Sequence, residues 1–164
     1  MKINSKQLLG FSLIELLVAV TVMMILLSGA LAFFLDYLDK RAVNNSVDEI
    51  KTYFQRALSD AKSGSLGGCD QLNGYRVTSA QAANIVTVTL QADCTVGTPN
   101  PAVTFDLAPN VSVTPNLNMI FKVLNAGVEL PGGVASQDIT VANDNNVYVF
   151  TIYREGRFSS GSWQ

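Results

Sequence analysis

The sequence contains no histidine among its 164 residues, and this absence narrows the chemistry open to the protein. Histidine is the commonest general base near neutral pH and the commonest metal ligand. Two cysteines without histidine are too few for a structural zinc site. The sequence also has no phosphate-binding glycine loop after a strand and no paired-carboxylate motif. We therefore expect neither an enzyme nor a bound cofactor or metal.

Charge is also scarce. Only 15% of the residues are charged, and 11 basic residues stand against 13 acidic ones, for a formal net charge of -2. Nucleic-acid binding needs clustered Lys or Arg side chains that neutralise phosphates. The acidic balance therefore argues against nucleic acid as a partner.

Proline is absent from residues 11–63, and charge is nearly absent from residues 11–35, where Glu15 is the one charged residue. As a helix rising about 1.5 Å per residue, this apolar stretch is long enough to cross a hydrocarbon core of about 30 Å. An ordinary secretory signal would have a shorter apolar core that ends at a small-residue cleavage site. Lys2 and Lys6 precede the stretch, which favours a single-pass protein of the cytoplasmic membrane with an exported C-terminal part.

Glu15 is out of place in such a segment. A carboxylate within an apolar membrane helix costs on the order of 3 kcal/mol on insertion scales. Either Glu15 lies shallow enough to reach the lipid headgroups, or it is a functional residue that meets a partner.

Residues Gly10 to Val20, with the sequence GFSLIELLVAV, resemble the class III signal of type IV pilins and pseudopilins. The resemblance implies that residues 1–10 are a leader peptide and that a prepilin peptidase cuts between Gly10 and Phe11. The same enzyme would methylate the new amino group of Phe11. Glu15 would then meet the N-terminal amine of a neighbouring subunit during filament assembly.

The resemblance also implies partners and a location. The partners are other pilin or pseudopilin subunits, the prepilin peptidase, an assembly platform membrane protein and its ATPase, with the membrane holding the subunit before assembly. The chain would be a structural subunit of a type IV pilus-like or type II secretion filament, in the periplasm or at the cell surface. Loss of Lys2 and Lys6 with the leader would leave nine basic residues against 13 acidic ones.

An apolar stripe continues the helical pattern beyond the membrane segment. Its members recur at spacings of three and four, as one face of a helix requires: Val43, Val47, Ile50, Phe54, Leu58 and Ala61. Gly64 ends the pattern as a C-cap, so we expect one continuous helix over residues 11–63. Residues 36–64 would be its amphipathic continuation.

Residues 65–164 instead show period-two alternation and turn residues. Strands are predicted at Ile85–Leu90, Ala102–Leu107, Met119–Leu124, Asp138–Ala142 and Val147–Arg154. Turns are predicted at clusters such as Asn73-Gly74 and Pro131-Gly132-Gly133. A helix stripe needs an apolar partner, and an antiparallel sheet with one apolar face supplies it. The predicted fold is α+β and pilin-like.

Two features of this part allow alternative readings. Cys69 and Cys94 would form a disulfide if the domain is exported, and would otherwise be two buried thiols. Asp144, in the run Asn143 to Asn146, could belong to a calcium loop. Its single carboxylate is short of the six to eight oxygen ligands that calcium prefers, which favours a solvated turn.

The C-terminal third, from Ile120-Phe121 to Phe158, is similar to the H-type minor pseudopilins and related minor pilins. Some competence-associated members carry a Gly-Arg-x-Arg turn that contacts DNA. Gly156 and Arg157 match that turn, but Ser159 stands in place of the second arginine. The leading hypothesis is therefore a minor pilin or pseudopilin. The alternatives are a DNA-binding or adhesive minor pilin of natural transformation and an exported domain that only keeps its anchor.

Overall fold

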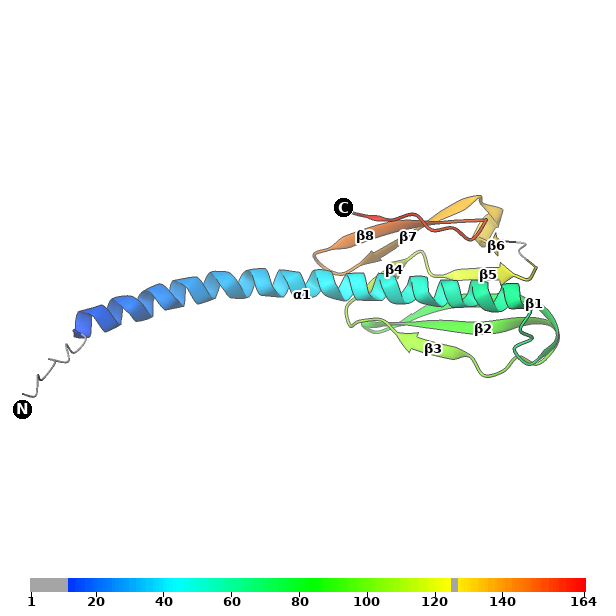
Figure 1. Ribbon diagram of the computed structural model, residues 1–164, viewed down its shortest axis with the longest axis horizontal. Helices are drawn as coiled ribbons and strands as arrows, with labels where there is room; N and C mark the ends of the chain where they lie inside the picture. Colours follow the sequence, from blue (N-terminus) through cyan, green and yellow to red (C-terminus); the bar gives the residue numbers. More distant parts are fainter. Residues whose placement is uncertain (1–11, 125–126) are drawn as a thin grey trace, which may run out of the picture. The chain divides into compact units, whose positions relative to one another are not determined.

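The fold is that of a computed structural model, which describes residues 12–124 and 127–164. The chain divides into two compact units, Met1–Tyr37 and Leu38–Gln164. Helix α1 (Leu13–Ser63) contributes its first half to one unit and its second half to the other (Figure 1). The amphipathic continuation therefore belongs with the strands. The predicted boundaries at residues 10, 35 and 64 stay predictions.

Helix α1 ends where the sequence predicts. Gly64 adopts a φ of +69°, and the amide of Ser65 donates to the carbonyl of Asp60 at 3.2 Å. This six-to-one hydrogen bond across a left-handed residue is a Schellman motif, which satisfies a carbonyl at the end of the helix. The glycine suits this position because a Cβ would be disfavoured in the left-handed conformation.

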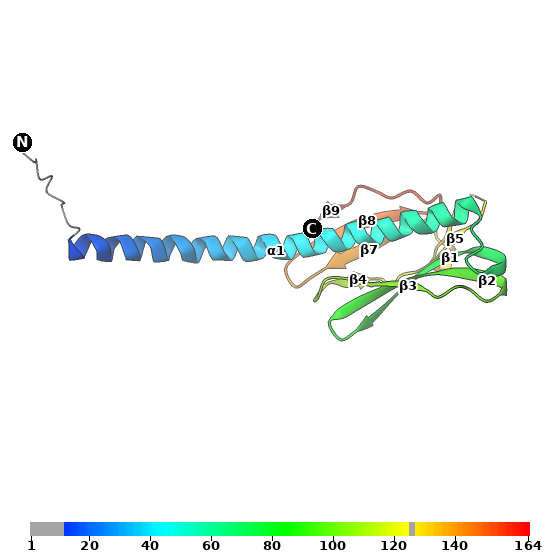
Figure 2. The same cartoon turned by 60° about the horizontal axis from the view of Figure 1, so that its bottom comes forward.

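The second unit contains two antiparallel sheets beside the second half of α1 (Figures 1 and 2), which confirms the α+β fold. The first sheet has the order β3-β2-β1-β5-β6, with strands β1 (Cys69–Ala82), β2 (Ile85–Gly97), β3 (Val103–Asp106), β5 (Asn118–Lys122) and β6 (Val128–Glu129). The second has the order β4-β7-β8-β9, with strands β4 (Ser112–Thr114), β7 (Ser136–Ala142), β8 (Val147–Tyr153) and β9 (Ser162–Trp163).

The longest strand, β1, was not predicted, and the turn predicted at Asn73-Gly74 is wrong. Both residues lie inside β1, where the ladder with β2 shifts register between Leu72 and Gly74. A Cβ on Gly74 would collide with the backbone oxygen of Phe121 on the neighbouring strand β5. The glycine therefore permits close approach of two strands and does not mark a reversal of the chain.

The five predicted strands all occur, with shifted ends. The largest difference is β2, which continues to Gly97 because it pairs with β1 along nearly its whole length. The strands β4, β6 and β9 have only two or three residues each. Such segments are too short to show the alternation of apolar and polar residues from which a strand is predicted.

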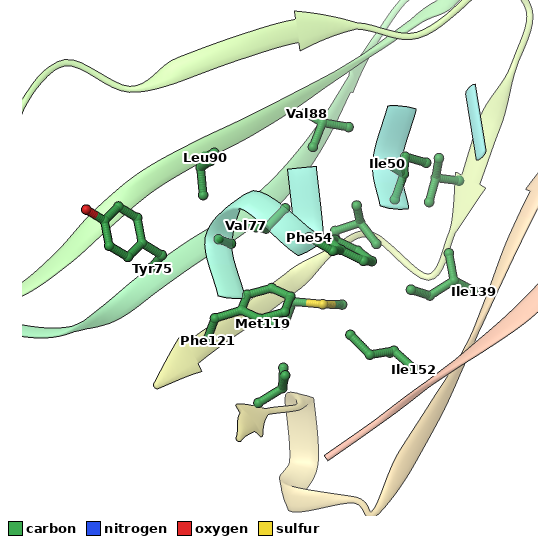
Figure 3. Close-up of a cluster of buried hydrophobic side chains, with 14 of the residues drawn as sticks. Ile50, Phe54, Tyr75, Val77, Val88, Leu90, Met119, Phe121, Ile139 and Ile152 are labelled. Atoms are coloured by element: carbon green, nitrogen blue, oxygen red, sulfur yellow. The ribbon is translucent and has the colours of Figure 1, made fainter. Parts of the chain in front are cut away.

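The hydrophobic core lies between α1 and both sheets (Figure 3). Five members of the predicted helix stripe are at most 2% exposed: Val43, Val47, Ile50, Phe54 and Ala61. The sixth, Leu58, is only partly buried, and Ala57 takes the fully buried place. A small residue at this point lets the helix approach the sheets closely.

Aromatic contacts join the helix to each sheet. Tyr53 stacks on Phe105 of β3 with ring centroids 4.0 Å apart. Phe54 meets Phe121 of β5 at 5.6 Å and Phe158 at 5.7 Å, so one side chain touches segments from both sides of the core. On the side of the second sheet, the Lys51 ammonium lies 5.0 Å from the centre of the Phe150 ring. Each aromatic pair adds about 0.5–1.5 kcal/mol beyond the stabilisation from the area that it buries.

Candidate functional site

The candidate processing site at Gly10 and Phe11 lies outside the described residues, which begin at Ser12.

Ser12 caps the start of α1. Its Oγ accepts a hydrogen bond from the amide of Glu15 at 3.3 Å, and its carbonyl accepts from the same amide at 3.1 Å. Serine followed three residues later by glutamate is the sequence pattern of a capping box, and this signal was missed in the sequence analysis. A carboxylate in the first turn also interacts favourably with the helix dipole. Among the described residues, the Glu15 carboxylate has no ion pair.

The apolar half of α1 is the one described helix that is long and apolar enough to span a membrane by length and composition. None of its most apolar stretch of 18 residues is buried, whereas the core helix of a soluble protein is mostly buried. Thr21 and Ser28 donate their hydroxyls to the carbonyls of Val18 and Ile25, each at 2.8 Å. Because these hydroxyls are satisfied within the helix, lipid need not supply a partner.

Cys69 and Cys94 form a disulfide with their Cα atoms 5.3 Å apart. The bond joins the first residue of β1 to β2 near the open end of the β1–β2 hairpin. A closed loop of this size contributes roughly 3 kcal/mol on the chain-entropy account.

Arg157 lies on the surface, with 72% of its side chain exposed. Its guanidinium is 3.4 Å from the Glu155 carboxylate and 4.8 Å from the centre of the Tyr153 ring. A carboxylate beside the guanidinium opposes phosphate binding, and the DNA contact at Arg157 stays a prediction.

The Asn143–Asn146 run forms a turn that contacts the helix. The Oδ1 of Asn143 accepts hydrogen bonds from the amides of Asn145 and Asn146, and its Nδ2 donates to the Asp39 carbonyl at 3.1 Å. The Nδ2 of Asn145 donates to the Asp39 carboxylate at 3.3 Å. We call these four side-chain bonds the Asp39 clasp. It was not predicted, because the two partners are about a hundred residues apart in the chain.

The geometry of the described residues around Asp144 does not favour a calcium loop. In the described ranges, no three His, Cys, Asp or Glu residues gather as a metal site would require. The Oδ1 of Asn143, which a cation could use as a ligand, is occupied by two backbone amides.

A charged network covers the outer face of the first sheet. The Arg76 guanidinium lies 2.8 Å from Asp93, Asn73 donates to the same carboxylate at 2.6 Å, and Lys122 lies 2.7 Å from Glu129. Lys122 also donates to the Asn73 side chain at 3.0 Å, so the network connects β1, β2, β5 and β6. Burial alone would raise the pKa of Asp93, but the hydrogen bonds and positive charges around it lower that pKa below its ordinary value.

Comparison with protein families places a known motif on the N-terminal segment. Residues 9–31 match the family described as the prokaryotic N-terminal methylation motif, the class III signal of type IV pilins. Neither the curated proteins nor the solved structures contain a significant match to the chain. The motif supports a type IV pilin-like or pseudopilin subunit, and the proteins of that family are structural components.

The network predicts a pH dependence for Asp93→Asn. A folded-state pKa below the ordinary value of about 3.9 adds stability above that pH, and this stability is lost as the pH falls through the folded pKa. We expect Asp93→Asn to lower the free energy of unfolding at pH 7 by about 2 kcal/mol and to flatten its decline below pH 4. Urea unfolding of the full-length protein in neutral detergent, followed by Trp163 fluorescence between pH 2 and 7, measures this. Asp144→Asn, in an exposed turn, is the control, and equal curves for both variants would contradict the expectation.

The Asp39 clasp predicts a local effect of Asn143→Ala. The change removes two acceptor bonds and one donor bond, which together hold the turn against the helix. We expect the local opening free energy to fall by about 1–2 kcal/mol, with faster amide exchange at Asn145, Asn146 and residues 39–43. Hydrogen–deuterium exchange with mass detection measures this. Asn145→Ala removes only the longest bond and should show a smaller change, so an equal or larger effect would refute this account of the clasp.

Proposed function

We propose that this chain is a minor pilin or pseudopilin, a structural subunit of a type IV pilus-like or type II secretion filament. One observation carries the proposal. The methylation motif at residues 9–31 overlaps helix α1 from Leu13 onwards, and this helix continues to Ser63, where its second half contributes to the core of an α+β unit. A secretory signal that is simply removed would not share one helix with the core of the mature fold.

In this proposal, prepilin peptidase cuts between Gly10 and Phe11 and methylates the Phe11 amine. The new N-terminus then stands directly before Ser12, the residue that caps α1. The positive amine would lie at the positive end of the helix dipole, where an ammonium is disfavoured unless an anion is near. A carboxylate from outside the subunit would relieve that repulsion.

Glu15 would supply that carboxylate to a neighbouring subunit. In a bundle of apolar helices without water, a lone carboxylate and a lone ammonium are each costly, and pairing offsets part of both penalties. The Ser12 cap uses the backbone amide of Glu15 and leaves its carboxylate available. The pair would therefore fix the register between subunits more than it would add stability.

The apolar side chains of α1 support transfer from the membrane into a filament. From Leu13 to Leu35 the described large apolar side chains are 43–85% exposed, so none of them depends on its own fold for burial. They could exchange lipid for neighbouring helices without meeting water, which avoids the hydrophobic cost of extraction. The partners we propose are other pilin or pseudopilin subunits, the platform protein and its ATPase.

The disulfide is consistent with an exported second unit. Disulfides persist in the periplasm and outside the cell and are rare in the cytosol. We propose a single-pass protein of the inner membrane that later becomes part of a periplasmic or surface filament.

The processing step predicts the mass of the protein in its native membranes. We expect an intact mass that lacks Met1 to Gly10 and carries one added methyl group. Gly10→Val should leave the leader in place, because a β-branched side chain would stand at the bond that is cut. A full-length, unmethylated mass for the wild-type protein would show that the motif is not read and that the protein is an anchored domain.

The proposed ion pair predicts that Glu15→Ala is processed normally but assembles poorly. Removing one partner leaves the other charge unpaired in an apolar core, which costs about 3–5 kcal/mol and corresponds to at least a hundredfold loss of association. The measurement is the amount of protein in sheared or pelleted filaments relative to the membrane pool. Glu49→Ala, an exposed acid on the second half of α1, is the matched control. Normal assembly of Glu15→Ala would favour the anchored-domain alternative.

A further inference from the structure

Two hollows border the edge strand β6. One has a volume of about 460 Å³ and the other of about 220 Å³. They share Glu129, Leu130 and Gly133 as lining residues, and so adjoin one another at the β6 edge of the first sheet. We call the two hollows together the β6 groove. The larger hollow alone is within the size range of ligand pockets.

The β6 groove is lined by three cationic side chains and one anionic one, although the protein as a whole is acidic. Two of the cations are engaged, because Arg76 binds Asp93 and Asn118, and Lys122 binds Glu129 and Asn73. The third, Arg154, has no ion pair among the described residues.

The arrangement around Arg154 keeps its guanidinium available. The nearest acid in the sequence, Glu155, is paired with Arg157. The Arg154 backbone is fixed, since its carbonyl accepts from the Val128 amide at 2.7 Å and its amide donates to the Ala135 carbonyl at 2.9 Å. The Arg154 side chain therefore extends from a fixed backbone position beside the groove. Its planar guanidinium can bind both oxygens of a carboxylate.

Apolar residues line the larger hollow next to Arg154. Val128 and Leu130 are almost fully buried, whereas Val134 is 44% exposed and offers an apolar contact. The turn Pro131–Gly133 borders the groove, and Cβ atoms added to Gly132 and Gly133 would meet no atom within 4 Å. The rim is thus open to an incoming chain.

We propose that the β6 groove binds an extended acidic segment of another protein, with a carboxylate on Arg154 and an apolar side chain against Val134. Charge complementarity supports this choice, because Arg154 has no ion pair among the described residues and could bind a carboxylate, while Val134 in the same hollow offers an apolar contact. Glu129 and Asp93 lie close by and would repel a dense polyanion such as nucleic acid. A segment whose carboxylates are separated by apolar residues avoids that repulsion. Recognition of acidic motifs by arginine side chains is a general mode of peptide binding.

The test measures fluorescence anisotropy of a labelled eight-residue peptide that alternates aspartate with valine. It uses the full-length protein in neutral detergent, with empty micelles as the blank. We expect saturable binding that weakens with salt, and a peptide with asparagine in place of aspartate should bind at least about tenfold more weakly. Arg154→Glu should weaken binding of the aspartate peptide by about tenfold or more.

Two further variants keep the result interpretable. Arg157→Glu makes the same charge change three residues away, outside the residues that line the groove, and should bind like the wild type. Val134→Trp fills the apolar side without changing charge and should also weaken binding. The proposal is overturned if the aspartate peptide does not bind, if the asparagine peptide binds equally well, or if Arg154→Glu and Arg157→Glu behave alike. None of these outcomes depends on whether the protein assembles into a filament.

Discussion

The second unit depends on the burial of one helix face. The stripe from Val43 to Ala61 supplies apolar surface that both sheets cover, and Phe54 at its centre touches aromatic rings from both sides of the core. Buried residues of the helix and of both sheets belong to one cluster, so the helix is a common element of the core that both sheets share. At about 25 cal/mol per Å² of buried apolar area, this contact outweighs any single hydrogen bond on the surface.

The same helix meets two requirements that rarely coincide. Its first half exposes apolar side chains on every side, which suits lipid or a bundle of helices and is unsuited to water. Its second half exposes polar residues and buries one stripe. From Leu13 onwards the methylation motif lies in the first half, whereas the Asp39 clasp contacts the second half. Assembly and folding can thus be specified by different residues of one element.

The sequence predicts the features that depend on local pattern, and it fails where contacts are long-range. The helix, its Gly64 cap and five strands follow from periodicity and turn residues. Strand β1 was not predicted because Asn73-Gly74 is a typical turn sequence. The close approach of β5 explains the glycine, and the local sequence does not show it. The clasp, the Arg76–Asp93 network and the β6 groove join residues that are distant in sequence, so no local signal marks them. The roles of Gly10, Phe11 and Glu15 rest on a motif and not on geometry.

The contact between Phe54 and Phe158 has a consequence for biosynthesis. The two rings meet in the core although 104 positions separate them along the chain. The helix stripe is synthesised first, and β8 and Phe158, which complete its cover, follow about a hundred residues later. A nascent chain must therefore hold an apolar helix face that is not fully covered while the residues between Phe54 and Phe158 are synthesised. Contacts of such long sequence separation form slowly, so final folding should follow synthesis and leave an interval in which chaperones have access to the stripe.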